Sequence, residues 1–393
     1  MKKFINPNDA KKIIESLEIT KKIETIAIKK SLGRVLATPI VAPFDFPPFD
    51  KSTMDGYAIS SKLGKKSFKI LGESKAGGAL QDNYKPTGCI HIMTGAYVPK
   101  VFDKVVRVEF THIDKDKMEI VQDEPFSNIT KGGAYFKKGD TLLCSCSVIT
   151  PQVIGLLCSV GLKQIQVFSK PKVGILTLGD ELLAQNQTYE TGKIYDSNLP
   201  MLACQVTNAG GKPTTYPIIK DNKNSIRKSV EKAFKENDIV LLSGGSSMGK
   251  YDFVPLVLKN LGVEFLFQKI AVKPGKPTYF GRLHNKYVYA LAGNPVSSFV
   301  TFELFVKPLI ASFLGQKPKE KILEVKPQFD FARKEADRKE YLPVKIVGDK
   351  CFHLNYKNSG HLAAICSADG FMIVDIGTYR VCSGRNQKAI VLN

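Results

Sequence analysis

Between residues 172 and 314, short apolar segments alternate with longer amphipathic ones, and this alternation limits the folds open to the chain more than any other feature. Segments with helical periodicity cover 197–209 and 223–235. Such alternation indicates βα units and a parallel sheet with helices on both faces, and ligands of these sheets bind beyond the carboxyl ends of the strands. We expect strands at 173–178, 217–219 and 238–243, with functional residues in the loops that follow them.

The flanking sequence predicts further domains. Apolar residues at helical spacing predict a helical segment over 8–30, and a short helix-like stretch returns near Pro151. From Ala42 to about Asp140, prolines and short strand-like runs separated by glycines predict a β-rich insertion. After a linker at Gly315, alternating short strands predict a small barrel or sandwich. The predicted domains are 1–41 plus 142–171, 42–141, 172–315 and 322–393, and the fold class is multidomain α/β.

The charge balance points to anionic ligands. Of 393 residues, 57 are Lys or Arg and 37 are Asp or Glu, which gives a net charge of +20. This balance favours nucleic acid, an anionic membrane or small anions as ligands. The lysines occur in pairs without a long run, and no RNA-recognition, zinc-finger or basic-zipper pattern accompanies them. We therefore expect no nucleic-acid partner.

The eight cysteines and the most apolar helix predict a reduced, cytoplasmic protein without a membrane span. The cysteines fall mostly inside apolar stretches and form no C-x-x-C pair, which favours reduced core thiols. The N-terminal residues lack the apolar segment of a secretory signal. The stretch from Val296 to Leu314 contains Glu303 and Lys307, so it is interpreted as a buried helix.

A glycine-rich turn directly follows the strand expected at 238–243. The segment from Ser243 to Asp252 reads S-G-G-S-S-M-G-K-Y-D. Glycines after a strand allow backbone N–H groups to approach an anion, which predicts a phosphate cradle. Gly244 to Lys250 also fits G-x-x-x-x-G-K, but Tyr251 stands where a nucleoside-triphosphatase needs a Ser or Thr hydroxyl for magnesium. We therefore reject that class.

Four carboxylates follow the expected strands and predict a divalent metal. They are Asp180, Glu181, Asp221 and Asp252. Around a phosphate cradle they would repel the anion unless a cation lay between them.

Two stiff segments offer further ligand groups. Prolines and a glycine hold Lys273 and Lys276 three residues apart, which suits a tetrahedral oxyanion. The segment from Gly293 to Ser298 opens the long apolar helix, and its hydroxyls are expected to cap that helix. Asp55 lies beside a glycine on a turn that exposes a carboxylate. The five histidines show no metal-ligand spacing.

Together these segments closely resemble one family, the molybdopterin molybdenumtransferases, which comprise the MoeA proteins and the gephyrin E-domain. The resemblance runs essentially from end to end and is carried by Leu32–Ala37, Pro47–Asp50 with Ser52, Met54–Ala58, Thr94–Ala96, Gly179–Leu182, Ser243–Gly245, Lys273–Pro277 and Gly293–Pro295. It implies four domains per subunit: an elongated N-terminal domain, an inserted β-rich domain that protrudes, a molybdopterin-binding α/β domain resembling MogA and MoaB, and a C-terminal β-barrel. It also implies a homodimer and the final step of molybdenum cofactor synthesis. In that step molybdate enters adenylylated molybdopterin, and AMP is released with Mg²⁺ present.

The resemblance also assigns roles to residues. It gives Asp180, Glu181, Asp221 and Asp252 to the nucleotide part of the site, the last three as metal ligands, and Asp55 and Thr94 to a contribution from the other subunit. It gives molybdate to Lys273, Lys276, Arg338 and Ser359. The substrate-binding residues expected in the two glycine-containing turns are Ser243, Gly244, Gly245, Ser246, Ser247, Gly249, Asn294, Pro295 and Ser297. The resemblance also makes the adenylyltransferase of the preceding step and apo-molybdoenzymes candidate partners.

The chain departs from the family pattern in two places. Gly133-Ala134-Tyr135 stands where the family usually reads Gly-Glu-Asp, and Ala292 stands where a proline commonly precedes Gly-Asn-Pro. Two alternatives to the transferase stay open. Tyr135 favours a non-catalytic molybdopterin-binding scaffold, and the parallel-sheet domain, which also occurs in the enzyme of the preceding step, allows a molybdopterin adenylyltransferase. The sequence does not separate molybdate from tungstate as the oxyanion.

Overall fold

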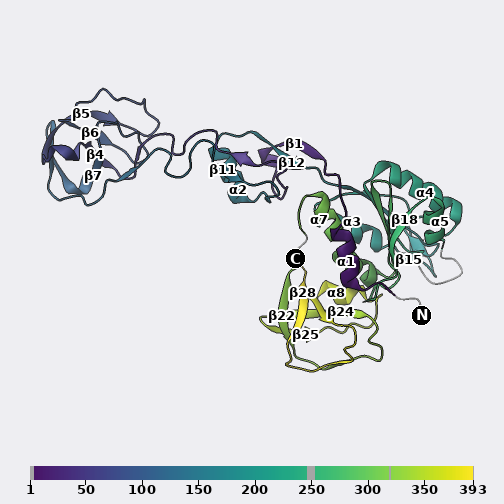
Figure 1. The fold of residues 1–393 in the computed structure, drawn as a ribbon. Coiled ribbons are helices and arrows are strands. Elements are labelled where there is room, and N and C mark those ends of the chain that lie inside the picture. The colour runs from purple at the N-terminus through teal and green to yellow at the C-terminus, as the bar shows by residue number, and fades with distance from the viewer. Residues whose placement is uncertain (1–3, 246–252, 318–319, 393) are drawn as a thin grey trace. The chain divides into compact units, whose positions relative to one another are not determined.

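A computed structural model describes residues 4–245, 253–317 and 320–392. The chain forms two compact units (Figure 1). The first unit comprises Met1–Ile26, Ser31–Ala37 and Ile165–Asn393, and the second comprises Ala27–Lys30 and Thr38–Gln164.

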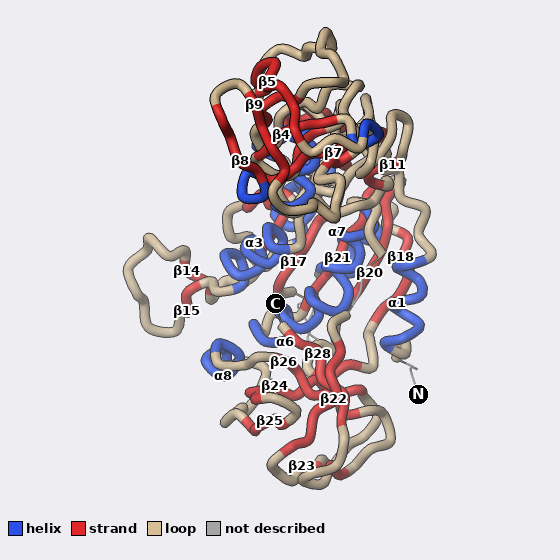
Figure 2. The backbone as a smooth tube through the Cα atoms, turned by 90° about the vertical axis from the view of Figure 1, so that its left-hand side faces the viewer, coloured by secondary structure: helices blue, strands red, loops and turns tan. Residues whose placement is uncertain are grey.

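The first unit is built on a six-stranded sheet of order β16-β13-β17-β21-β20-β18 (Figure 2). The first four strands are parallel, and β20 and β18 extend the sheet in antiparallel fashion, an edge that the sequence did not predict. The strands are β13 (Lys172–Thr177), β16 (Lys212–Thr215), β17 (Ile239–Ser243), β18 (Glu264–Gln268), β20 (Tyr279–Leu283) and β21 (Lys286–Leu291).

Helices cover both faces of this sheet because successive strand side chains point to opposite sides. Ile239 and Leu241 belong to one apolar cluster with α3 (Asn198–Asn208), whereas Val240 and Leu242 belong to another. The second cluster is closed by α4 (Lys223–Glu236) and α5 (Val254–Asn260). The predicted α/β fold class is therefore confirmed, as are the helices expected at 197–209 and 223–235.

Two local predictions are wrong. The helix expected over 8–30 ends early: α1 spans Pro7–Glu15, and β1 (Ile23–Ala27) pairs with β12 (Gln164–Phe168). The β-branched residues of β1 favour an extended chain over a helix. The strand expected at 217–219 lies instead at β16, whose polar residues suit a sheet edge, and Ile219 makes only a single bridge to Leu178.

The long apolar helix is continuous from 295 to 313. It comprises α6 (Pro295–Thr301), a π-helical turn η4 (Phe302–Val306) and α7 (Lys307–Phe313). Among the described residues it is the one helix with the length and hydropathy of a membrane span, and 67% of its most apolar window is buried inside the protein. Phe302, Phe305 and Leu309 lie in the core cluster, which confirms a buried helix.

A small closed barrel completes the first unit. Strands β24-β25-β22-β28-β26 form a ring because β26 also pairs with β24, so the barrel is confirmed over the sandwich. The two-residue strand β19 (Val272–Lys273) pairs with β24 outside this ring. The remaining elements are β22 (Ile322–Pro327), β23 (Phe331–Ala332), β24 (Lys339–Val347), β25 (Lys350–His353), α8 (Leu362–Cys366), β26 (Gly370–Val374), β27 (Arg380–Val381) and β28 (Gln387–Val391).

The second unit contains a six-stranded sheet of order β7-β4-β6-β5-β9-β8, as expected for a β-rich insertion. Its two faces carry separate clusters, with Ala58 and Ile90 in one and Tyr57 and Cys89 in the other. Its strands and helix are β2 (Ile40–Val41), β3 (Lys51–Ser52), β4 (Gly56–Ile59), β5 (Ser67–Ser74), β6 (Cys89–Ile92), β7 (Lys104–Arg107), β8 (Thr111–Asp114), β9 (Lys117–Ile120), β10 (Ile129–Thr130), β11 (Thr141–Leu143) and α2 (Pro151–Ser159). The four domain boundaries stay predictions.

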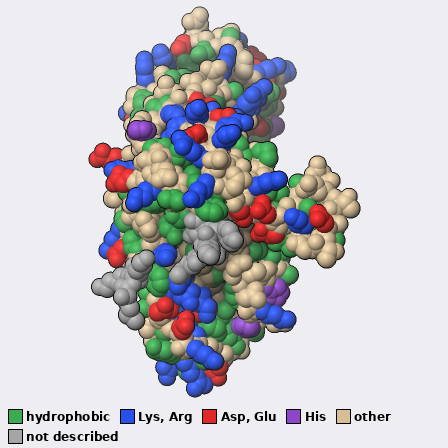
Figure 3. Space-filling model, turned by 90° about the vertical axis from the view of Figure 1, so that its right-hand side faces the viewer, with side chains coloured by type: hydrophobic (Ala, Val, Ile, Leu, Met, Phe, Trp, Pro, Cys, Tyr) green, Lys and Arg blue, Asp and Glu red, His purple; other side chains and the backbone are tan. Residues whose placement is uncertain are grey.

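The surface partly agrees with the sequence analysis. Lys and Arg side chains are scattered over the face in Figure 3 among hydrophobic and acidic ones.

All eight cysteines are free thiols, but only Cys89 and Cys351 are buried, so the expectation of core thiols is wrong for most of them. Their apolar sequence neighbours belong to short strands and helices that expose one side.

The fully buried Tyr289 on β21 donates its hydroxyl to Phe305 O in the π-helical turn, at 2.9 Å. Tyr289→Phe removes this bond and leaves a buried carbonyl without its donor, so we expect a loss of about 1–2 kcal/mol in the free energy of unfolding, measured by urea denaturation. Tyr287→Phe is the matched control, because no hydrogen bond of the Tyr287 hydroxyl is present among the described residues. Equal losses in the two variants would contradict this role of the bond.

Candidate active site

Three parallel strands of the first unit end side by side. Thr177, Ser243 and Leu291 are register partners at the carboxyl ends of β13, β17 and β21. The loops that follow carry, in the same order, the carboxylate pair, the glycine pair and the Gly-Asn-Pro segment. The predicted chemistry therefore gathers along one edge of the sheet.

The carboxylates of this edge lie close enough to affect one another. Asp221 N donates to Asp180 Oδ1 at 3.4 Å. Burial raises the pKa of the Asp221 carboxyl above its usual value, and the negative charges of Asp180 and Glu181 raise it further. The structure thus brings three of the four predicted carboxylates together, while Asp252 lies outside the described residues.

The backbone conformation at Gly244 and Gly245 requires glycine at both positions. Gly244 has φ +95°, and a Cβ there would lie 2.3 Å from Leu178 O, so any other residue would collide with the neighbouring loop. Ser243 is buried, and its hydroxyl lies 3.2 Å from Ser298 Oγ, so a hydrogen bond connects the start of the glycine turn to α6. The predicted Ser246, Ser247 and Gly249 lie outside the described residues.

Beneath the loops lies a buried polar network that the sequence analysis missed. Asn198 Nδ2 donates to Ser243 Oγ at 2.8 Å and to Gly293 O at 2.7 Å. Asp196 accepts from Thr177 Oγ1 at 2.5 Å and from Asn198 N at 3.0 Å. These bonds join all three strand ends. The run of polar residues 196–198, directly before an amphipathic helix, was the available signal.

All four residues assigned to the oxyanion line one pocket of about 740 Å³ in the first unit. Lys273, Lys276, Arg338 and Ser359 surround it together with Asn294 and Ser297. Sequence reasoning missed three more basic residues of its lining, Arg333, Lys334 and Lys357. Six basic residues face only Glu335 and Glu340, so the pocket favours an anion.

Two contacts fix the lysines of the pocket. Lys273 Nζ lies 3.0 Å from Glu340, which is only 4% exposed and also pairs with Arg333 at 3.3 Å. Lys276 Nζ lies 4.6 Å from the centre of the Phe4 ring. Between the lysines, Gly275 has φ +119°, and a Cβ there would meet Thr301 Cγ2 at 2.4 Å, so the turn tolerates no side chain.

Asn294 connects this pocket to the glycine-rich edge. Its Nδ2 donates to Ser359 Oγ at 2.9 Å. At the neighbouring Gly293, an added Cβ would lie 3.4 Å from Gly244 Cα, so these two glycines lie close together. The predicted capping by hydroxyls is wrong: Asn294 makes no side-chain cap, and Val296 N donates to Ser359 O at 3.0 Å. Pro295 is the first residue of α6. Gly293 and Asn294 therefore join the cationic pocket to the glycine pair at the sheet edge.

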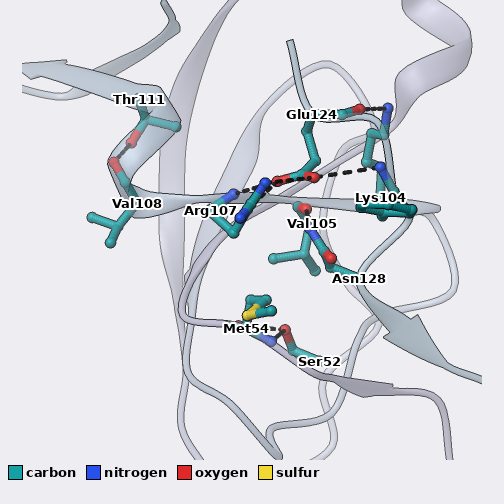
Figure 4. Close-up of polar contacts among 10 residues, drawn as sticks. Ser52, Met54, Lys104, Val105, Arg107, Val108, Thr111, Glu124 and Asn128 are labelled. Atoms are coloured by element: carbon teal, nitrogen blue, oxygen red, sulfur yellow. Dashed lines mark hydrogen bonds and ion pairs between the residues drawn. The ribbon is translucent and has the colours of Figure 1, made fainter. Parts of the chain in front are cut away.

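In the second unit, the structure brings Asp55 and Thr94 together. Thr94 N donates to Asp55 Oδ1 at 2.6 Å, and this hydrogen bond holds the pKa of the exposed Asp55 carboxyl below its usual range. Ser52 Oγ donates to Met54 O at 2.6 Å and stabilises the turn before Asp55 (Figure 4).

The neighbouring strand is held by a buried ion pair. Arg107 Nε lies 2.8 Å from Glu124, and Lys104 Nζ donates to Glu124 O at 2.6 Å (Figure 4). Burial opposes ionisation of Glu124, but hydrogen bonds from Arg107 and Phe126 outweigh it and lower the pKa of this carboxyl. The result is a rigid support for the Asp55 turn, whose carbonyl accepts from Val108 N.

Tyr135, which replaces an expected carboxylate, is 61% exposed. Its ring lies 6.1 Å from Phe46 and 5.6 Å from Lys51 Nζ. At this position the chain therefore has a tyrosine in contact with Phe46 and Lys51, where the family pattern has a carboxylate.

Three family models match consecutive parts of the chain. They describe the MoeA N-terminal region (domain I and II) over residues 5–161, a probable molybdopterin binding domain over 174–312, and the MoeA C-terminal region (domain IV) over 328–392. A Haemophilus influenzae protein named molybdopterin molybdenumtransferase is 35% identical over 317 residues, which cover 78% of this chain and 76% of that protein.

The chain belongs to the molybdopterin molybdenumtransferase family. A Bacillus subtilis member is 30% identical over 388 residues, covering 94% of this chain and 90% of that one. The crystal structure of a Pyrococcus horikoshii molybdopterin biosynthesis MoeA protein matches with a TM-score of 0.88 and 29% identity over 99% of both chains. The family comprises transferases of molybdenum cofactor biosynthesis, which confirms the predicted resemblance and enzyme class.

The residues at the sheet edge suit Mg²⁺ in their chemistry. Carboxylate oxygens are its preferred protein ligands, and a cation would offset both the burial of Asp221 and its repulsion by Asp180 and Glu181, which together raise the pKa of Asp221. Within residues 4–245, 253–317 and 320–392, no three His, Cys, Asp or Glu side chains converge as a metal site. Mg²⁺ usually keeps several waters and binds through one or two carboxylates and substrate phosphates, so a full set of protein ligands is not required here.

The raised pKa of Asp221 predicts a gain in stability when its charge is removed. A carboxyl that binds its proton more tightly when folded loses stability as pH rises through that pKa. Asp221→Asn should thus raise the free energy of unfolding at pH 7 by about 0.5 kcal/mol, and this gain should shrink as pH falls toward 4. Urea denaturation across this range measures it. Glu190→Gln, a nearby exposed carboxylate change, should show no such trend, and a destabilised Asp221→Asn at pH 7 would refute the repulsion.

Proposed function

We propose that this protein inserts molybdate into adenylylated molybdopterin, with Mg²⁺-dependent release of AMP, as the final step of molybdenum cofactor biosynthesis. The observation that carries the proposal is the junction at Asn294, where a cationic pocket meets a phosphate-type glycine edge on one surface. A pterin dithiolene at the pocket and a pyrophosphate at the glycines would fit this arrangement.

The pocket suits molybdate for a physical reason. Molybdate is a tetrahedral dianion, and donors fixed before binding lose little entropy on holding it. Glu340 holds Lys273 in place, and the Gly275 turn holds Lys276 at a set spacing from it. Arg338 is held by Asp337 and Glu335 at 3.4 Å each, and the Ser359 hydroxyl is oriented by Asn294. These four groups bind and orient the oxyanion.

At the other end, Glu181, Asp221 and Asp252 would hold Mg²⁺, which would supply charge neutralisation for the substrate phosphates. Gly244 and Gly245 allow the backbone to approach the pyrophosphate, and Asp180 supports Asp221 by accepting its backbone N–H. Oxyanion and nucleotide are thereby oriented toward each other.

Lys276→Gln tests the oxyanion role, because Lys276 lies in the pocket without an ion pair to a described carboxylate. We expect molybdate to be bound about 10-fold more weakly or worse, while the fold is kept. Purified protein with adenylylated molybdopterin, Mg²⁺ and molybdate is followed for AMP release and for reconstitution of an apo-molybdoenzyme. Lys228→Gln on the outer face of α4 is the control. If AMP release by Lys276→Gln depended on molybdate concentration as it does in wild type, the pocket would not be the molybdate site.

The same assay separates the alternatives. A scaffold binds adenylylated molybdopterin without releasing AMP, and Tyr135 in place of a carboxylate keeps this outcome open. An adenylyltransferase consumes ATP with molybdopterin. Competition between molybdate and tungstate identifies the preferred oxyanion.

The proposed active form is a homodimer in which Asp55 and Thr94 of one subunit complete the site of the other. Asp55 is exposed and oriented by Thr94, as a group that meets substrate should be. Mixing inactive Asp55→Asn and Asp221→Asn proteins should then restore about a quarter of wild-type AMP release, since half of the random dimers regain one intact site. Mixed dimers without any activity would place Asp55 in its own subunit's site, whereas an active Asp55→Asn protein would place Asp55 outside the reaction. The dimer acts in the cytoplasm between the adenylyltransferase and apo-molybdoenzymes.

A further inference from the structure

A loop at the carboxylate edge exposes two aromatic rings that the proposed reaction has not used. Strands β14 (Leu182–Leu183) and β15 (Ile194–Tyr195) form a parallel pair, and the loop between them extends from the first unit in Figure 2. Tyr189 is 62% exposed and Tyr195 44% exposed. Their ring centroids are 6.5 Å apart, with an angle of 43° between the planes.

The loop is fastened directly to the backbone of the two acidic residues, Asp180 and Glu181. Lys193 Nζ donates to Asp180 O at 2.5 Å, and Ile194 N donates to Glu181 O at 2.9 Å. Immediately after Tyr195, the buried Asp196 accepts from Thr177 Oγ1 at the end of β13. The Tyr195 hydroxyl donates to Gln187 O at 3.1 Å within the loop. The Tyr195 ring is therefore held at a fixed place beside Asp180 and Glu181.

The Tyr195 hydroxyl is already bonded to Gln187 O, and its ring face is exposed, so this ring can stack on a flat ligand. Stacking on a base is worth about 1–3 kcal/mol for each base. The chain contains no tryptophan, so tyrosine and phenylalanine supply all of its large stacking surfaces.

The order of groups along the sheet edge identifies the ligand. The strands run β13, β17, β21, so the tyrosine loop and carboxylates come first, the glycines second and Asn294 third, followed by the cationic pocket. Adenylylated molybdopterin carries its groups in the same order: adenine, phosphates, pterin with its dithiolene. With the oxyanion in the cationic pocket, the adenine falls at the tyrosines.

We propose that Tyr195, assisted by Tyr189, stacks on the adenine ring of the substrate and of the product AMP. This inference rests on the proposed function. It makes the two tyrosines binding residues for the nucleobase, while the phosphate and oxyanion contacts remain with the residues named above.

The test compares ligands with and without the base. AMP and ribose 5-phosphate are titrated by calorimetry, with Mg²⁺, against wild type and the variants Tyr195→Leu, Tyr189→Leu and Tyr195→Phe. We expect Tyr195→Leu to weaken AMP binding roughly 5- to 150-fold and to leave ribose 5-phosphate binding unchanged. Tyr195→Phe keeps the ring but loses the hydrogen bond to Gln187, so it should bind AMP nearly as wild type does.

A second readout follows the base itself. The fluorescence of 2-aminopurine riboside 5′-monophosphate falls when the base stacks, so wild type and Tyr195→Phe should quench it and Tyr195→Leu should not. Equal weakening of AMP and ribose 5-phosphate would overturn the stacking role and leave only a role in loop structure. AMP binding that is unchanged in both leucine variants would overturn it as well. These outcomes leave AMP release intact, whereas failure of the proposed function appears as wild type that releases no AMP.

Discussion

The side-chain amide of Asn198 is the contact on which the arrangement of the site depends. From the start of α3 it donates to Ser243 Oγ at the end of β17, within the buried interior, and to Gly293 O after β21, at a partly buried position. Buried polar groups of this kind are costly when unpaired and rigid when paired, so the network sets the loop positions more firmly than apolar packing alone would. The glycine edge, the Asn294 contact to Ser359 and the Tyr195 loop all start from backbone that this network holds.

Charge is organised in a complementary way at the two ends of the site. At the cationic pocket, Glu340 is buried between Lys273 and Arg333, so one carboxylate fixes two cations and leaves the lining net positive. At the carboxylate edge the like charges face one another, and burial together with the charges of Asp180 and Glu181 raises the pKa of Asp221. One end is thus ready for an anion and the other for a cation. A substrate that carries phosphate between them suits both.

Much of this could be predicted from the sequence, and the failures have physical reasons. The strands at 173–178 and 238–243 are buried on both faces, so their apolar runs were unambiguous. The edge strand β16 is half polar and was missed for that reason, and β1 shares the spacing of a helix but has β-branched residues. The site residues were found through motifs with stiff or glycine-rich backbone. Asp196 and Asn198 show only a short polar run before a helix, and Arg333 shows no local motif. Their importance comes from distant partners: Thr177 for Asp196, Ser243 and Gly293 for Asn198, and the shared ion pair with Glu340 for Arg333.

The π-helical turn at Phe302–Val306 bears on how the length of this chain can vary. Such a turn holds one residue more than an α-helical turn, and the Tyr289 hydroxyl supplies a donor to its Phe305 carbonyl from outside the helix. Residues on either side keep their core faces, with Val300 before the turn and Leu309 after it both fully or almost fully buried. The helix therefore absorbs an extra residue locally without rotating α7 out of the core. In a lineage of related chains, this is the place where one residue can be gained or lost while the sheet, the barrel and the pocket between them keep their geometry.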